Sequence, residues 1–385
     1  MLEMIDIPKA SHDNSDFATQ RTLINHQYAA LSSEDKAKRA RDIAKQLNVT
    51  EATWVAAGCG PIQSIRLAGS AQEILQKIGP LNRVMALTRN DACVHERHGQ
   101  YSEIETQGHI GLVLGPEIDL RLFFACWQDA FAVQERDRQS LQFFDSEGIA
   151  VHKIYCTDQT DTASYLRLVQ EHATSPAFPD IKSIPKTVPE SSVDSPDEFR
   201  RAWLAMLDTH DFFPLIRRFN VSRLGALSCV GNDLAQQVPV TAIQAVLLEA
   251  AQTDLEIMCF VGNRGMIQIH TGRISNIAMR GPWLNVLDPS FNLHLNMDAV
   301  SSAWVVNKPT EDGWVTSLEV FSHDGEMITQ FFGARKPGKP ELASWRALML
   351  SLCAEPLRAT VSGTLGANGA IEALGTLGAP GAHHA

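Results

Sequence analysis

The sequence predicts an α+β protein built as a tandem structural duplication, in which each half is a helical segment followed by a large antiparallel β-sheet. Three observations lead to this fold class. Short β-rich runs alternate with Gly, Asp and Asn turns, which is typical of antiparallel sheets. Helical periodicity precedes these runs in both halves. Residue types also recur at a constant separation, which indicates an internal repeat.

The repeat is seen in turn residues that match between the halves. The separation is 173 residues through most of the β-rich region and 177 residues near its end. We therefore expect four extra residues in a loop around Lys308. The matched pairs are Gly99 with Gly272, Pro116 with Pro289 and, at the larger separation, Gly148 with Gly325. Shared residues are most simply scaffold, so function is sought where the halves differ.

The composition divides the chain into segments. A run rich in Pro, Ser and Asp lies near the middle and is typical of a linker, and the end of the chain is rich in Gly and Ala. We expect a loosely held N-terminus at 1–16, a first repeat at 17–175, a linker at 176–194, a second repeat at 195–352 and a low-complexity tail at 353–385.

The helical segment of the first half contains a charged run that begins near Ser33. Ser33 is the expected N-cap of one helix, because a serine precedes the first residues with helical periodicity. The apolar positions at helical spacing are Ala40, Ile43, Ala44 and Leu47.

A second helix is predicted to begin at Ser195 in the other half. Ser195 and Glu198 have the spacing of a capping box, and Pro196 suits the first helical position. Pro214 is expected to break or kink this helix. One face would carry Phe199, Trp203, Met206, His210 and Phe213.

His210 would then point toward the apolar side of that helix. Such a histidine is either a hydrogen-bonded core residue or a ligand, and the stretch around it, with aromatic residues and two arginines, has the composition of an iron porphyrin site. At an offset of 172 residues, Lys38 lies opposite His210 in the first half. The histidine is therefore specific to the second half, which favours a functional role.

Charge and cysteine content exclude several classes of protein. A formal net charge of −11 argues against nucleic acid as a partner. The N-terminus does not resemble a secretory signal and no apolar run is long enough to span a membrane, so we expect a cytoplasmic protein. Seven scattered cysteines without a CxxC pair argue against disulfides, structural zinc and iron–sulfur clusters.

Several ordered blocks carry a family resemblance. VMALTRN, LGPEIDLRLF, NRGMIQIHTG and FFGARKPGKPEL together resemble the bacterial haemin-degrading and haemin-transport proteins of the HemS, HmuS and ChuS type, from about residue 17 to residue 352. The resemblance implies a cytoplasmic haem-binding protein of haem-iron utilisation. Its expected partners are an inner-membrane haem importer and a downstream haem oxygenase or haem-using protein.

The resemblance also implies roles for individual residues. His210 would be the proximal iron ligand, and Arg121 the distal arginine supplied by the first half; in an enzyme both would be catalytic. Phe123 and Phe213 would line the pocket. The polar and basic positions around the porphyrin edge would be Arg223, Lys308, Gln330 and Arg335.

Each of these residues also has a plain structural interpretation. Arg223 and Arg335 could form surface ion pairs, Lys308 could be solvated in a loop, and Phe123 could be a core residue of an alternating strand. The family pattern places a tyrosine immediately before Gln330, where this chain has Thr329.

Two haem-related functions and one unrelated function stay open at this point. The protein is either a haem carrier or an enzyme that opens the porphyrin with an electron donor of unknown identity; a duplicated interaction module without haem is the third alternative. The sequence contains no dinucleotide-binding fingerprint. Carrier and enzyme both need His210 and Arg121, so the residues do not distinguish them.

Overall fold

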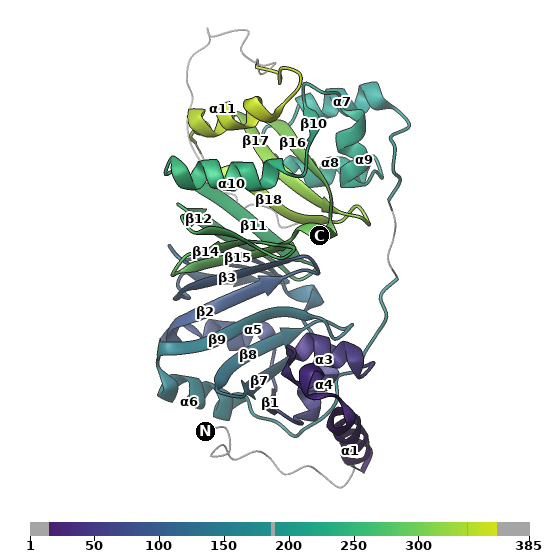
Figure 1. Cartoon of the computed structure of the whole chain (residues 1–385), viewed down its shortest axis with the longest axis vertical. Coiled ribbons are helices and arrows are strands. Elements are labelled where there is room, and N and C mark those ends of the chain that lie inside the picture. The colour runs from purple at the N-terminus through teal and green to yellow at the C-terminus, as the bar shows by residue number, and fades with distance from the viewer. Residues whose placement is uncertain (1–14, 186–188, 337, 360–385) are drawn as a thin grey trace.

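The computed structural model describes residues 15–185, 189–336 and 338–359, which form helices and two large antiparallel sheets (Figure 1). Each sheet has nine strands. The predicted α+β class and the duplication are confirmed, because the described elements repeat in the same order in both halves. The sheet orders are β1-β7-β8-β9-β2-β3-β15-β14-β13 and β10-β16-β17-β18-β11-β12-β6-β5-β4.

The first half begins with helices and continues into nine strands. Its helices are α1 (Ser15–Ala30), α2 (Ser33–Ala37), α3 (Ala40–Gln46), α4 (Glu51–Ala57), α5 (Ala71–Gln76) and α6 (Thr162–His172). Its strands are β1 (Ile62–Leu67), β2 (Asn82–Arg89), β3 (Cys93–Gln100), β4 (Ile104–Gln107), β5 (Ile110–Leu114), β6 (Asp119–Phe123), β7 (Asp129–Glu135), β8 (Arg138–Phe144) and β9 (Ala150–Thr160).

The second half repeats this order. Its helices are α7 (Pro196–Leu204), the 3₁₀ turn η4 (Thr209–Asp211), α8 (Phe212–Arg218), α9 (Arg223–Cys229), α10 (Ala242–Gln252) and α11 (Ala343–Leu352). Its strands are β10 (Ala235–Val238), β11 (Ile257–Asn263), β12 (Met266–Gly272), β13 (Ile277–Arg280), β14 (Trp283–Leu287), β15 (Phe291–Asn296), β16 (Val300–Thr310), β17 (Gly313–Ser322) and β18 (Met327–Gly333).

The two halves exchange three strands. Strands β4 to β6 join the sheet of the second half, where β6 pairs with β12, and β13 to β15 join the first sheet, where β15 pairs with β3. Asp119 faces Ile269 in one junction and Asn292 faces Glu96 in the other, so the two junctions have the same register at the 173-residue offset. The exchange places Arg121, a first-half residue, in the second sheet.

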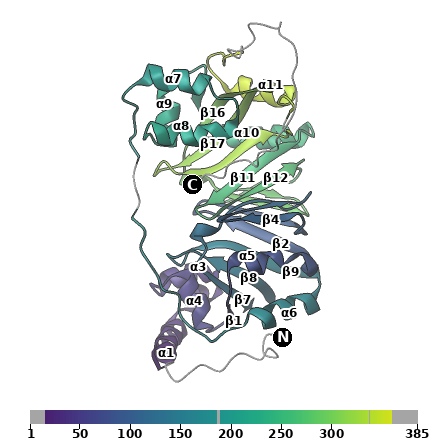
Figure 2. The same cartoon turned by 180° about the vertical axis from the view of Figure 1, so that it is seen from behind.

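Helices cover the two faces of the second sheet differently. On one face, α10 and α11 pack on a core that includes Leu318, Phe331 and Trp345. On the other face, α7 to α9 pack against the β16–β17 end, around Trp304 and Phe321. Figure 2 shows the same division from behind.

The prediction of one helix from Ser33 is wrong in its details. Ser32 is the N-cap, since its hydroxyl accepts a hydrogen bond from the Asp35 N–H at 3.1 Å. The helix breaks at Lys38 and Arg39, which have extended backbones, and resumes as α3. The predicted apolar stripe, which begins at Ala40, is buried. No residue of α2 is buried, so tertiary packing does not hold the first turn in line with α3.

The prediction of one helix from Ser195 through His210 is also wrong. The Ser195 side chain forms no cap, although Pro196 does occupy the first turn. The helix ends at Leu204, and a new turn begins at Asp208, whose side chain accepts the His210 backbone N–H at 2.8 Å. Asp side chains compete in this way with a continuous helix. Pro214 lies in the first turn of α8, where its missing N–H is tolerated.

The four extra residues do not form a loop around Lys308. They lengthen the β16–β17 hairpin, in which Lys308 pairs with Val315 and Thr310 with Gly313. In the first half the shorter hairpin closes after Glu135 pairs with Arg138. Lys308 is consequently a buried strand residue, with 3% of its surface exposed, and the expectation of a solvated loop residue is wrong.

Part of the predicted tail is packed on the second half. Residues 353–359, which the composition assigns to the tail, pack on the second half: Leu357 is buried and the Glu355 N–H donates to Gln236 at 3.0 Å. The remaining tail, 360–385, and the N-terminal residues 1–14 lie outside the described residues. Within the described ranges, none of the helices combines the length and apolar character needed to cross a bilayer.

Candidate functional site

One face of the second sheet presents polar and apolar side chains in register. Residues directly opposite one another in neighbouring strands project from the same face of a sheet. A row of such partners runs across β17, β18, β11, β12 and β6, and it consists of Glu319, Gln330, Phe260, Ile269 and Asp119. Gln330, which is 9% exposed, therefore shares this face with residues of the first half.

Thr329 lies on the opposite face. Its side chain is buried and its hydroxyl donates to the Phe260 carbonyl at 2.9 Å. Its Oγ1 is also 3.7 Å from the Cys259 Sγ. A side chain at position 329 therefore points away from the face that carries Gln330, and the departure from the expected tyrosine affects the packed side of the sheet.

His210 lies on the surface beside the same end of the sheet. Its side chain is 91% exposed, in the single turn η4. Two carboxylates hold this turn: Asp208 accepts the His210 N–H, and Asp211 accepts the backbone N–H groups of Leu207 and Asp208, both at 3.0 Å. The expectation that His210 points to the apolar side of a helix is wrong. The neighbouring residues Trp203, Met206 and Phe212 fill the core instead.

Asp208 also fixes the imidazole. The distance between Asp208 Oδ1 and His210 Nδ1 is 2.6 Å. Burial raises the pKa of the Asp208 carboxyl, but the hydrogen bonds from the His210 backbone and ring outweigh it and lower the pKa overall. A histidine that donates through Nδ1 keeps a free electron pair on Nε2, which is the arrangement of many metal ligands. Sequence reasoning missed Asp208; the signal available was an aspartate two residues before the histidine.

A buried charge cluster lies behind η4. Arg223 donates to both oxygens of Glu319, at 2.7 and 2.8 Å, and Lys308 Nζ lies 2.7 Å from Glu319 Oε1. The two cations also lie over the ring of Phe212, at 4.8 Å for the guanidinium and 4.4 Å for the ammonium. The Ser317 hydroxyl donates to the same carboxylate at 3.1 Å. Glu319 and Phe212 were not identified from the sequence.

The cluster carries one net positive charge. Burial lowers the pKa of Lys308 to about 8, although Glu319 opposes the shift. Burial alone would raise the pKa of Glu319, but Arg223 and Lys308 hold it well below its usual range. Glu319 is therefore an anion with two cationic partners, which a buried carboxylate needs. Arg223 is part of this internal pair rather than a surface ion pair.

Arg335 follows the end of β18. Its Nη2 lies 3.4 Å from Asp312 Oδ2 in the β16–β17 turn, and its Nε is buried without a hydrogen-bond partner. Phe213, in α8, is partly buried, and the Arg217 guanidinium lies 5.9 Å from the centre of its ring.

Arg121 and Phe123 belong to β6. The Arg121 guanidinium is one third exposed and donates to Asp119 and to the Leu120 carbonyl. Phe123 is half-buried, with its backbone N–H bonded to the Gly265 carbonyl at 2.8 Å. Three strand spacings separate β6 from β18, about 15 Å. The structure thus brings Arg223 and Lys308 together and keeps Arg121 apart from them and from the His210 turn.

Between these polar groups the sheet face is apolar. Met258, Phe260, Ile267 and Phe332 are all half-buried. The rings of Phe260 and Phe332 are 5.1 Å apart and nearly perpendicular. A flat apolar molecule could lie on this surface, with cations at one edge and an imidazole beside it.

Comparisons with known proteins identify the family of the chain. The family model of the haemin-degrading HemS.ChuX domain matches residues 48–172 and 220–352, one copy in each half. The hemin transport protein HemS of Yersinia enterocolitica is 40% identical over 330 residues, which cover 84% of this chain and 95% of the relative.

Two solved structures are similar in fold and sequence. Holo-PhuS, a heme-binding protein from Pseudomonas aeruginosa, has a TM-score of 0.82 and 38% identity, covering 86% of this chain and 99% of the other. The heme-degrading enzyme ChuS of Escherichia coli O157:H7 has a TM-score of 0.80 and 37% identity, with the same coverage. On this evidence the chain belongs to the family of haemin-degrading HemS.ChuX domains.

Proposed function

We propose that this protein is a cytoplasmic haem-binding protein of haem-iron utilisation that holds haem iron through His210. The observation that carries the proposal is the His210 turn, in which Asp208 binds Nδ1 and leaves Nε2 exposed. An imidazole oriented in this way is a good ligand for iron. The repeated HemS.ChuX domain and the relatives named for hemin transport and heme binding support it.

The neighbouring residues suit the rest of the haem molecule. Haem is a flat apolar ring with two carboxylates. The half-buried Phe260 and Phe332 offer an apolar surface, and the Arg335 Nε is a buried donor without a partner. Such a donor is costly unless a ligand or water accepts its hydrogen bond. In this proposal Arg335, Lys308, Arg223 and Gln330 surround the porphyrin edge, and Phe213 and Phe123 line its passage.

Arg121 has the distal role in this proposal. It lies on the face of the second sheet that the haem would occupy, and its partner Asp119 is only partly buried. A guanidinium can donate hydrogen bonds to water or to an anion bound at iron. To do so, Arg121 would exchange its bond to Asp119 for one to the iron-bound group.

The proposed role includes transfer of haem between partners. A ligand on an exposed single turn is accessible to a donor or acceptor protein, unlike one inside a closed core. In this proposal an inner-membrane haem importer is the source of the haem, and a haem oxygenase or haem-using protein is its destination.

Haem degradation is the second candidate function. It is favoured by the cationic Arg121 on the haem-facing side and by the similarity to ChuS, which is described as a heme-degrading enzyme. Opening the porphyrin to release iron would require an oxidant such as oxygen or peroxide and an electron donor. His210 would hold the iron, and Arg121 would orient the iron-bound group.

Titration with haemin tests the binding proposal. We expect one equivalent to produce a Soret band shifted from that of free haemin, and His210→Ala to remove or displace that band. His26→Ala is the matched control, because His26 is an exposed histidine on α1. An unchanged spectrum for His210→Ala would show that another residue binds the iron.

A turnover assay separates carriage from degradation. The haem complex is mixed with a reductant in the presence of catalase, and the Soret band is followed together with released iron. Loss of the band with a defined tetrapyrrole product would support an enzyme. A stable complex that gives up haem only to an acceptor protein would support a carrier.

A further inference from the structure

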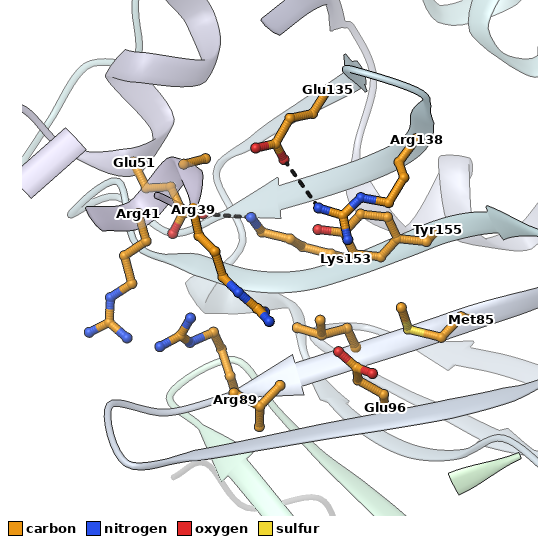
Figure 3. A pocket seen from close by; sticks show the side chains of 13 residues that line it. Arg39, Arg41, Glu51, Met85, Arg89, Glu96, Glu135, Arg138, Lys153 and Tyr155 are labelled. Atoms are coloured by element: carbon orange, nitrogen blue, oxygen red, sulfur yellow. Dashed lines mark hydrogen bonds and ion pairs between the residues drawn. The ribbon is translucent and has the colours of Figure 1, made fainter. Parts of the chain in front are cut away.

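A polar pocket lies in the first half. It has a volume of about 50 Å³ and is formed by the start of α3, the start of α4 and strands β2, β3, β7, β8 and β9. Five of its lining side chains are cationic and three are acidic. The cationic residues are Arg39, Arg41, Arg89, Arg138 and Lys153. Figure 3 shows the ends of Arg39, Arg41 and Arg89 gathered on one side of the pocket.

The pocket occupies the place in the first sheet that the charge cluster and His210 turn occupy in the second. Helices α3 and α4 match α8 and α9 residue for residue at an offset of 172. Glu51 at the start of α4 corresponds to Arg223, and Glu135 in β7 corresponds to Lys308. The duplication therefore supplies a direct comparison for every residue of the pocket.

The three gathered arginines are specific to the first half. At the same offsets, Asp211 replaces Arg39, Phe213 replaces Arg41 and Gly262 replaces Arg89. A shared structural requirement of the fold therefore does not explain these three cations. Their role is therefore specific to the first half.

Two of the three lining carboxylates are already paired with the other two cations of the pocket. Glu51 binds Lys153 at 2.5 Å, and Glu135 lies 3.9 Å from Arg138. Within the described chain, Glu96, the third lining carboxylate, forms no ion pair with any of the gathered arginines. None of the three lining carboxylates therefore forms an ion pair with a gathered arginine in the described part of the chain.

Two of the arginines have no acidic partner. Arg41 pairs with Asp91, which is almost fully exposed. Neither Arg39 nor Arg89 has a carboxylate partner in the described part of the chain, and the Arg89 Nε donates instead to the carbonyl of its neighbour Asn90 at 3.3 Å. Burial and the proximity of Arg41 both lower the pKa of Arg89. Like charges held together in a recess are costly unless an anion joins them.

We propose that this pocket binds a phosphate-type oxyanion, either inorganic phosphate or the phosphate group of a small phosphomonoester. The planar guanidinium groups of Arg39, Arg41 and Arg89 would donate paired hydrogen bonds to its oxygens. A tetrahedral dianion would give Arg39 and Arg89 the paired negative charge that neither receives from a carboxylate in the described part of the chain.

Haem is a poor fit for the same pocket. The cavity is far smaller than the several hundred cubic ångströms that larger organic ligands need. Lys38 stands where His210 stands in the second half, and its ammonium is bound to Asp35 at 2.6 Å. Arg89 fills the position that Gly262 leaves open in the second sheet.

Calorimetric titration of the full chain tests the proposal. The titrants are inorganic phosphate and glycerol 3-phosphate, a simple phosphomonoester, in chloride buffer of constant ionic strength. We expect one saturable site, weakened about tenfold or more by Arg89→Gln and lost in Arg39→Gln/Arg89→Gln. Tighter binding of the ester would identify a phosphorylated small molecule as the ligand, and tighter binding of inorganic phosphate would identify the free ion.

The controls separate specific binding from folding and screening. Arg201→Gln removes an exposed arginine of α7 and should leave the titration unchanged. The pocket variants should keep the thermal midpoint of the parent in phosphate-free buffer, because they remove cations that form no ion pair in the described part of the chain. Absence of saturable binding, or equal binding by the double variant, would refute the proposal. So would a second equivalent of haemin that disappears in the double variant.

Discussion

The two halves have the same backbone plan, but they differ in how they treat charge at the same place. In the second half Glu319 joins Arg223 and Lys308 in a closed, buried cluster, and an exposed histidine stands beside it. In the first half the position of Glu319 is taken by the neutral Gln142, and arginines gather around an open recess. The comparison teaches that the two copies share one backbone frame while the charged residues at this place differ between them.

The largest expected effect comes from making the second half resemble the first at Glu319. Glu319→Gln would leave Arg223 and Lys308 buried without an anion, so we expect the free energy of unfolding to fall by about 3–5 kcal/mol. Urea denaturation followed by circular dichroism measures this change. Glu326→Gln, at an exposed position, is the control. A change similar to that of the control would mean that the cluster contributes little to stability.

The next effect concerns the orientation of the proposed iron ligand. Asp208→Asn would keep a side-chain oxygen near η4 but remove the charge that holds the imidazole. We expect haem affinity to fall by about 10–100-fold. The measurement is the dissociation constant from the Soret titration, with Asp197→Asn on the exposed surface of α7 as the control. Unaltered affinity would assign Asp208 a role in the turn alone.

The strand exchange marks a limit of what could be predicted from the sequence. The repeat and the alternating strands are local patterns, so the fold class could be predicted from the sequence. Which sheet β4 to β6 would join could not, because the alternation of apolar residues is the same whichever neighbour a strand has. The family resemblance implied only that Arg121 of the first half would face the ligand, and not that its strand would join the second sheet.

The site residues show a second limit. Pattern reasoning extended α7 through His210 because apolar residues continue at helical spacing, but the side chains of Asp208 and Asp211 start a separate turn. Glu319 was missed because a single glutamate within a strand is ordinarily exposed. Only the fold places it between Arg223 and Lys308.

A smaller effect is expected on the pH dependence of the unfolding free energy, and it arises from a histidine at the junction between the halves. His270 is buried, and its ring stacks on the ring of Phe291 with the two ring centroids 3.8 Å apart. Burial lowers its pKa to about 3. The unfolded chain, with a histidine pKa near 6.5, binds the extra proton as the pH falls below that value. The contribution of His270 to stability is thus present above about pH 6.5 and declines by about 1.4 kcal/mol per pH unit toward pH 3.

Substitution of His270 isolates this contribution. In His270→Gln the slope of unfolding free energy against pH between 6 and 4 should decrease by about one proton, while buried His152, whose pKa is lowered to about 3 by burial, continues to titrate. Urea midpoints measured at half-unit intervals give the slope. An unchanged slope would show that His270 is already protonated in the folded protein or exposed to water.

The smallest expected effect is the sharpest check on the comparison. Lys38→His places an imidazole where His210 stands in the second half, at the cost of one surface ion pair with Asp35. We expect haem stoichiometry to stay at one and stability to change by less than about 0.5 kcal/mol. A ligand by itself does not make a haem site, because Arg89 and the paired Glu51 and Lys153 still occupy the recess. A second haem equivalent in this variant would show that the lone histidine, rather than the surrounding surface, distinguishes the two halves.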